Sequence, residues 1–162
     1  MIANRAPTLG TLLRHLVELL DGAVEESYAR AGLDYRPRYT PVVRALLEGG
    51  PASIRAISRY AGITHSAASQ TVSQMEKLGL VSLGEGGDAR ERIVALTPAA
   101  EAMIPWLERQ WAATNTAAQV LDEELSAPLS DLLQEAIAAL ERRPFAQRIE
   151  QAAAESKRSK KR

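Results

Sequence analysis

The stretch Thr64-His65-Ser66-Ala67-Ala68-Ser69-Gln70-Thr71-Val72-Ser73-Gln74-Met75-Glu76-Lys77-Leu78-Gly79-Leu80-Val81 decides how the rest of the chain is interpreted. It predicts a helix that Thr64 caps at the start and that Gly79 ends, because glycine tolerates a positive φ. One apolar stripe follows spacings of four, three and three residues, which places it on the buried face of the helix: Ala68, Val72, Met75 and Leu78.

The opposite face of this helix is polar, and it holds no acidic residue between Thr64 and Met75. Exposed helix faces usually mix both charges, so this face suits a polar, anionic surface such as the major groove of DNA. Gln70 could form a paired hydrogen bond with adenine N6 and N7. The alternative is a solvated polar face without a partner. The candidate DNA contacts on this helix are Thr64, His65, Ser66, Ser69, Gln70, Ser73 and Gln74.

The neighbouring segments predict a winged helix-turn-helix. A short helix over 53–61 and a tight turn at Gly62 precede the polar helix, which is the helix-turn-helix order. Strands at 80–83 and 90–96 then form a two-stranded hairpin, or wing. Arg90, beside its glycine-rich tip, is a candidate for a phosphate or minor-groove contact. Asp88 is expected to orient Arg90, and Arg92 is expected to contact either DNA or a nearby glutamate.

Long amphipathic helices flank this central region, so the predicted fold class is mainly α with a small β-hairpin wing. The first helix covers 8–32 and spans ~40 Å, which favours a shared interface with a partner chain over packing on its own domain. Residues 35–39 are expected to form a loop, and Thr40-Pro41 a helix start. Further helices are predicted from Thr97 to about residue 122, from about 126 to 140, and from 145 to 154.

Composition excludes several classes of protein. The 162 residues contain 46% hydrophobic and 25% charged residues, as expected for one domain with an added oligomerisation element. No run approaches the ~18 apolar residues of a membrane span, and no apolar signal core is present at the N-terminus, so a cytoplasmic location is expected. Without cysteine and with two histidines, no disulfide or metal site is expected. No catalytic constellation or cofactor motif is present, which argues against an enzyme.

The charge distribution is uneven although the formal net charge is zero. Five lysines and arginines lie in the last six residues, and every acidic residue lies at or before Glu155. The rest of the chain is therefore net negative, so any DNA-binding charge must be local. The basic tail predicts a nonspecific electrostatic contact at most.

Four local motifs, in order and spacing, resemble the MarR family of bacterial transcription regulators, and the resemblance extends from about Thr8 to Phe145. The motif Asp88-Ala89-Arg90 resembles the family's Asp-x-Arg wing signature. Gln70 departs from the arginine common in the family, which puts the base preference in doubt, and Ala100 replaces a frequent glycine. The other motifs are Gly62-Ile63-Thr64-His65-Ser66, Met75-Glu76-Lys77-Leu78-Gly79-Leu80-Val81 and Leu96-Thr97-Pro98.

The resemblance implies a homodimer joined by its terminal helices, with two winged domains that read a palindromic operator in double-stranded DNA. It also implies a small, often aromatic effector in a crevice, for which His15, Tyr39 and Trp106 are the rim candidates. The absence of cysteine excludes the peroxide-sensing branch. The implied domains are an N-terminal dimerisation helix (1–36), the winged helix-turn-helix (37–97), C-terminal dimerisation helices (98–155) and a disordered basic tail (156–162).

Two functions remain open at this point. One is a sequence-specific homodimeric regulator, with repression as the expected mode, that a small aromatic effector releases from DNA. The other is a winged-helix interaction module without specific DNA readout, which the zero net charge favours and which would bind a protein through the long helices.

Overall fold

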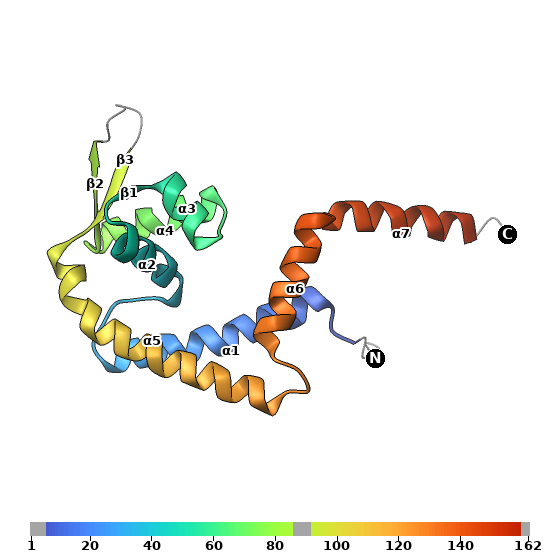
Figure 1. Ribbon diagram of the computed structural model, residues 1–162, viewed down its shortest axis with the longest axis horizontal. Coiled ribbons are helices and arrows are strands. Elements are labelled where there is room, and N and C mark those ends of the chain that lie inside the picture. The colour runs from blue at the N-terminus through green and yellow to red at the C-terminus, as the bar shows by residue number, and fades with distance from the viewer. Residues whose placement is uncertain (1–5, 86–91, 160–162) are drawn as a thin grey trace, which may run out of the picture. The chain divides into compact units, whose positions relative to one another are not determined.

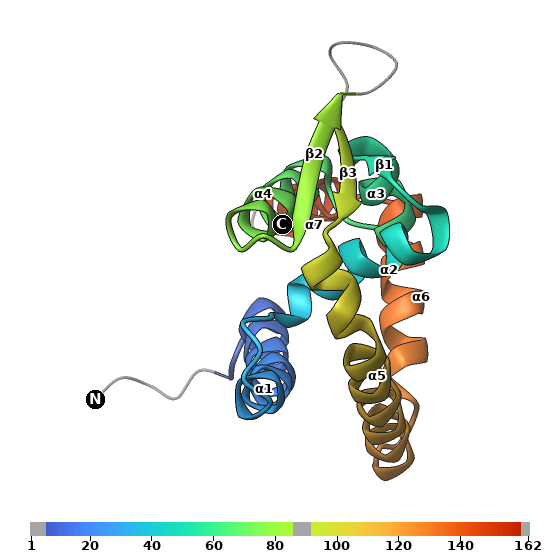
Figure 2. The ribbon, with the colours of Figure 1, turned by 90° about the vertical axis from the view of Figure 1, so that its left-hand side faces the viewer.

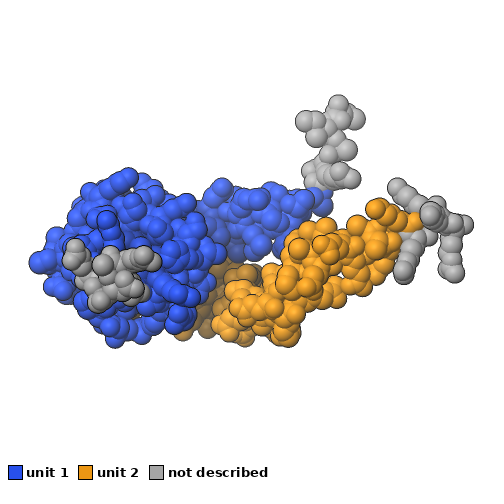
Figure 3. Space-filling model, turned by 90° about the horizontal axis from the view of Figure 1, so that it is seen from above, with its two compact units in different colours: residues 1–108 blue, residues 109–162 orange. Residues whose placement is uncertain are grey.

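The computed structural model describes residues 6–85 and 92–159 (Figure 1), and it divides into two units, residues 1–108 and 109–162 (Figure 3). The elements confirm a mainly α fold with a small β-sheet wing. In chain order they are α1 (Leu9–Arg30), η1 (Pro37–Tyr39), α2 (Thr40–Gly49), β1 (Ala52–Ser53), α3 (Ile54–Ala61), α4 (His65–Lys77), β2 (Val81–Glu85), β3 (Arg92–Leu96), α5 (Pro98–Glu124), α6 (Leu129–Arg142) and α7 (Phe145–Ser159).

The sheet of the first unit has three antiparallel strands in the order β1-β3-β2, whereas the sequence predicts only a two-stranded hairpin (Figure 2). Strand β1 pairs Ala52 with Val94, and β2 pairs Leu83 with the same Val94. The sequence pattern misses β1 because two residues are too short to show strand alternation. Its presence anchors the start of α3 to the wing.

The core of the first unit joins the helix-turn-helix to the sheet and to the first half of α5. Ile57 of α3, Met75 of α4, Val94 of β3 and Leu107 of α5 are all fully buried. Since each packs from a different element, the burial of their apolar surface holds α3 and α4 in a defined position beside the wing.

Three boundaries differ from the sequence-based expectations. Pro37–Tyr39 is a 3₁₀ turn rather than a loop, and it leads directly into α2. Thr40 is therefore the first helical residue, and Tyr39 takes the cap position without a side-chain hydrogen bond. Leu78 is 41% exposed because it lies just beyond the last residue of α4, and Thr71 is buried in its place on that helix face.

Helix α1 begins as predicted, with the Thr8 hydroxyl accepting a hydrogen bond from the Thr11 amide at 3.3 Å. The predicted apolar stripe is present, yet Tyr28 is the one buried residue of the helix. The leucines along the rest of α1 are exposed to solvent, with Leu9 67% and Leu20 45% exposed. Most of this apolar face has no covering within the first unit.

In the second unit, Asp122 at the end of α5 caps the start of α6. Its carboxylate accepts hydrogen bonds from the Leu129 amide at 2.7 Å and the Ser130 hydroxyl at 2.6 Å. Arg148 of α7 then donates to the carbonyls of Ala139 at 2.9 Å and Arg143 at 3.1 Å. These side chains fix both turns of the unit, α5 to α6 and α6 to α7.

Helix α7 extends to Ser159, so residues 156–159 are helical although the sequence analysis expected disorder from Ser156. The preceding alanines, Ala152 to Ala154, are the strongest helix formers and carry the helix onward. Basic side chains after them suit the C-terminal end of a helix dipole. Over residues 6–85 and 92–159, no helix combines the length and the hydropathy needed to cross a membrane.

Candidate nucleic-acid interface

Helix α4 is bounded by the two residues that the sequence singles out. Thr64 has an extended backbone, and its hydroxyl accepts a hydrogen bond from the Ala67 amide at 3.1 Å. At the other end Gly79 has φ 69°, and its amide donates to the carbonyl of Glu76 at 2.9 Å. Both the cap and the positive-φ stop are thereby confirmed.

The turn before α4 sets its angle to α3. Gly62 adopts the left-handed conformation, with φ 64°, directly after the last residue of α3. The Ile63 amide donates to the carbonyl of Ser58 at 3.1 Å and closes the turn. A β-carbon is disfavoured at this φ, so glycine at this position permits the helix-turn-helix geometry.

The two faces of α4 differ as the sequence predicts. The inner face is formed by Ala68, Thr71, Val72 and Met75, all buried. Of the candidate contacts, Ser69 and Gln74 are half-buried. The amide oxygen of Gln74 is buried and has no hydrogen-bond partner among the described residues, so Gln74 is less available to DNA than its position suggested. The exposed candidates are Thr64, His65, Ser66, Gln70 and Ser73.

One side chain joins α4 to α5. The Thr97 hydroxyl donates a hydrogen bond to the carbonyl of Gly79 at 2.6 Å and accepts one from the Ala100 amide at 3.2 Å. Thr97 therefore caps α5, as predicted, and also binds the chain just after α4. The second contact could not be predicted from spacing, since the two residues are 18 apart in sequence.

In the wing, Arg92 is exposed and lies opposite Glu85 in the register of β2 and β3. Both predicted roles for Arg92, contact with DNA and contact with a nearby glutamate, stay predictions. Asp88 and Arg90, the two other wing candidates, lie outside the described residues.

The exposed face of α3 carries two arginines, Arg55 and Arg59, that the sequence analysis did not single out. A signal for them was present. Acidic residues are absent not only between Thr64 and Met75 but over the whole segment 49–75. This segment contains all of α3, the turn and all but the last two residues of α4.

Two of the three effector candidates lie in one aromatic cluster, which we define as Tyr28, Tyr35, Tyr39 and Trp106. The ring centroids are 4.9 Å apart for Tyr28 and Tyr35, 5.6 Å for Tyr35 and Tyr39, and 5.7 Å for Tyr28 and Trp106. The Tyr35 hydroxyl donates to the Thr40 hydroxyl at 3.3 Å, and burial raises the pKa of Tyr35 well above its ordinary value. The cluster joins α1, η1 and α5 within the first unit.

The burial of Tyr39 and Trp106 changes the roles that were expected for them in binding an effector. Tyr39 is 2% exposed, so it is a core residue and not a rim residue, whereas Trp106 is half-buried. His15 is exposed, and its Nδ1 lies 3.9 Å from Glu18 Oε2. Along α1 it is ~20 Å from Tyr28, which is too far for both to contact one small ligand.

Metal binding finds no support in the described part of the chain, where no group of three histidine, aspartate or glutamate side chains could hold an ion. The site consists of a capped polar helix, a preceding helix with exposed arginines and an antiparallel wing. These elements define a winged helix-turn-helix protein.

Within this class, part of the chain is similar to the MarR family of transcriptional regulators. Residues 32–91, which contain the helix-turn-helix and most of the wing, match the family model described as "MarR family". This match confirms the resemblance that the local motifs indicate. No curated protein matches the chain.

Solved structures of regulators share the fold. A MarR family transcriptional regulator from Silicibacter pomeroyi is 24% identical, with a TM-score of 0.60, and the match covers 83% of this chain and 96% of that one. PcaV from Streptomyces coelicolor, solved with its natural ligand, is 22% identical with a TM-score of 0.60, covering 88% and 99%. BpsR from Bordetella bronchiseptica, whose DNA binding is regulated by 6-hydroxynicotinic acid, is 18% identical with a TM-score of 0.52, covering 70% and 84%.

Proposed function

We propose that this protein is a MarR-family transcriptional regulator, a repressor that binds a palindromic operator as a homodimer and is released by a small aromatic ligand. The observation that carries the proposal is the exposed, acid-free polar face of α4 in a helix-turn-helix. A helix of this kind fits the major groove, where hydroxyl and amide groups meet base edges without repulsion from the phosphates.

On this proposal Gln70 is the principal base-reading side chain, because it is the longest exposed hydrogen-bonding side chain near the middle of α4. Ser66 and Ser73 flank it at one turn's distance, and Thr64 and His65 lie at the helix start, where phosphates are favoured. Ser69 and Gln74 have secondary roles because they are half-buried. In the wing, Arg90 and Arg92 contact DNA, and Asp88 orients Arg90.

The homodimer is supported by two uncovered apolar surfaces. Helix α6 has no buried residue, although its apolar side chains follow helical spacing. A monomer would expose all of this surface to water, whereas each fully buried leucine or isoleucine is worth about 1.5–3 kcal/mol. The exposed apolar residues are Leu9, Leu12, Leu13, Val17, Leu19 and Leu20 on α1, and Leu132, Leu133, Ile137, Leu140, Phe145 and Ile149 on α6 and α7.

A second copy of the chain is the occupant that fits these surfaces. In a dimer with a two-fold axis, the same surface of each protomer forms the interface, and the dimer carries two copies of α4. Two copies of α4 then enter successive major grooves about 34 Å apart, which requires an operator with inverted half-sites. The segments 1–36 and 98–155 are the dimerisation parts in this arrangement, and 37–97 is the DNA-binding part.

Release by an aromatic ligand is supported by the aromatic cluster and by the relatives. Of the similar proteins, PcaV was solved in complex with its natural ligand, and DNA binding by BpsR is regulated by 6-hydroxynicotinic acid. In this chain Trp106 is the half-buried member of the cluster and the one available to a ligand. A ligand that binds one arrangement of the winged domains better than the DNA-bound one weakens operator binding by that difference in affinity.

The experiment that tests the proposal is a gel-shift titration of the purified chain against DNA from upstream of its gene and against random duplex of equal length. Specific binding that an aromatic acid reverses supports the proposed regulator. Equal affinity for both duplexes supports the other function, a winged-helix interaction module that binds a protein. Thermal-shift measurements with aromatic acids identify ligands that bind the folded state.

A further inference from the structure

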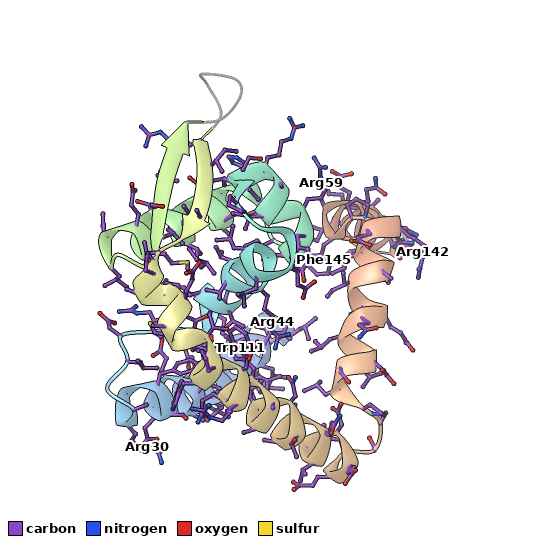
Figure 4. The ribbon with its side chains drawn as sticks, turned by 60° about the vertical axis from the view of Figure 1, so that its left-hand side comes forward. Arg30, Arg44, Arg59, Trp111, Arg142 and Phe145 are labelled. Atoms are coloured by element: carbon purple, nitrogen blue, oxygen red, sulfur yellow. The ribbon has the colours of Figure 1, made fainter. Side chains whose placement is uncertain are left out.

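Helix α3 presents two uncompensated positive charges on its solvent face. Arg55 and Arg59 are four residues apart, so they lie one turn from each other on the same side of the helix. Both are exposed, while Ile57 and Ser58 between them are buried. Figure 4 shows Arg59 on α3 and Arg30 at a distant part of the same unit, at the end of α1.

Neither guanidinium has an intramolecular partner among the described residues, in ion pairs or in hydrogen bonds. Other arginines of the chain are engaged: Arg30 lies 3.5 Å from Glu26, and Arg148 binds two carbonyls. Glu48, the acid that precedes α3, accepts a hydrogen bond from the Tyr60 hydroxyl, which raises the pKa of Tyr60, and it forms no ion pair with Arg55 or Arg59 among the described residues. The positive field of α3 is therefore free to act outward.

The polar helix beside α3 carries little charge of its own. Besides His65, its one basic residue is Lys77, in the last turn and next to Glu76. Electrostatic attraction to phosphates supplies a large share of protein–DNA affinity, and α4 cannot provide it. In a helix-turn-helix the first helix crosses the DNA backbone while the second enters the groove.

We propose that Arg55 and Arg59 bind phosphates of duplex DNA beside the groove that α4 enters. On this assignment α3 supplies affinity and α4 supplies sequence choice, so the two properties reside on different helices. The inference rests on the proposed DNA-binding function and adds the residues that hold the phosphate backbone.

The test is a fluorescence-anisotropy titration of the full chain, repeated between about 50 and 300 mM KCl, on operator and on random duplex. We compare the wild type with R55Q, R59Q and the double variant. The double variant should bind both duplexes more weakly, and this deficit should be largest at 50 mM KCl and shrink by a factor of several hundred, roughly, towards 300 mM. The slope of log K against log salt should become less steep by about 0.9 per lost contact, or about 4 for the four arginines of a dimer.

Two controls separate charge from position. R30Q removes an exposed arginine that lies beside Glu26 on α1, and it should leave the affinity within about twofold of wild type and the slope unchanged. The double lysine variant keeps both charges on α3 and should keep most of the slope. Far-UV circular dichroism checks the fold of each variant. An unchanged slope in the double glutamine variant overturns this inference while leaving the proposed function in place. Failure of the wild type to bind any duplex overturns both.

Discussion

At the scale of single residues, Thr97 connects the chain just after α4 to the start of α5. Its hydroxyl donates to the Gly79 carbonyl just after α4 and accepts from the Ala100 amide in the first turn of α5. The same side chain therefore caps α5 and binds the chain just beyond the end of α4. A threonine followed by proline predicts the cap from sequence, but only the fold shows the bond to Gly79.

Replacing Thr97 with alanine should lower the free energy of unfolding by about 1–2 kcal/mol, because a helix cap and a second hydrogen bond are lost together. T97S keeps the hydroxyl and is the matched control. Urea denaturation followed by circular dichroism measures both. A T97A protein as stable as T97S would show that these hydrogen bonds contribute little.

A second prediction at this scale concerns Gln70. Q70A should lose about 1–3 kcal/mol of discrimination between the preferred base pair and others, with little change in affinity for random duplex. The control is Q134A, which removes an exposed glutamine from α6. Competition gel shifts with single-base operator variants give the measurement, and an unaltered base preference would exclude Gln70 as a reader.

At the scale of elements, the junction between α5 and α6 depends on one carboxylate. The hydrogen bond from the Ser130 hydroxyl, together with weaker ones from the Leu129 and Ser130 amides, holds the pKa of Asp122 below its ordinary value, although burial acts in the opposite direction. The ionised form is thus favoured in the folded state. Its stabilising contribution is complete above the unfolded pKa and disappears as the pH falls through the lower folded pKa.

Acidification from pH 5 to about pH 2 should therefore destabilise the α5–α6 junction. D122N should remove part of this acid sensitivity and should be less stable than wild type at pH 7. E123Q changes the neighbouring exposed glutamate and should behave as wild type. Thermal melts at each pH provide the comparison. Parallel pH profiles for D122N and wild type would argue against the capping role.

Most elements of this fold follow from local sequence, and the exceptions have physical causes. The helices starting at Thr8, Ser53 and Thr64 are predictable because a capping residue precedes an apolar repeat. Strand β1 depends on long-range pairing with β3, so no local pattern predicts it. The basic composition of the tail predicts disorder from Ser156, whereas the high helix propensity of the preceding alanines favours continuation of α7 to Ser159.

The sequence predicts the part of the candidate interface that lies on α4, but not the part that lies on α3. The polar face of α4 follows from helical spacing, and Gln70 is exposed as expected. Arg55 and Arg59 were missed because α3 was considered only for its inward residues. Tyr39 was expected at a rim but is buried, since the 3₁₀ turn that precedes α2 directs it into the aromatic cluster.

At the scale of the whole molecule, the proposed dimer requires the apolar surfaces of α1, α6 and α7. Leu132 and Ile137 are 50% and 57% exposed in the single chain. Substituting either with glutamate should favour the monomer, because a buried unpaired charge at an apolar interface costs several kcal/mol. Q134E adds the same charge beside the stripe and is the control. Sedimentation velocity distinguishes the species, and dimers in all variants would exclude this surface from the interface.

The most direct measurement is selection of bound duplexes from a random pool by the wild-type chain, followed by sequencing and affinity titration. We predict enrichment of one inverted repeat whose half-site centres lie about 10 base pairs, or a multiple of one helical turn, apart. The selected duplex should bind at least about a thousandfold more tightly than random DNA. A pool without an enriched motif, bound no more tightly than random duplex, would contradict sequence-specific reading by α4.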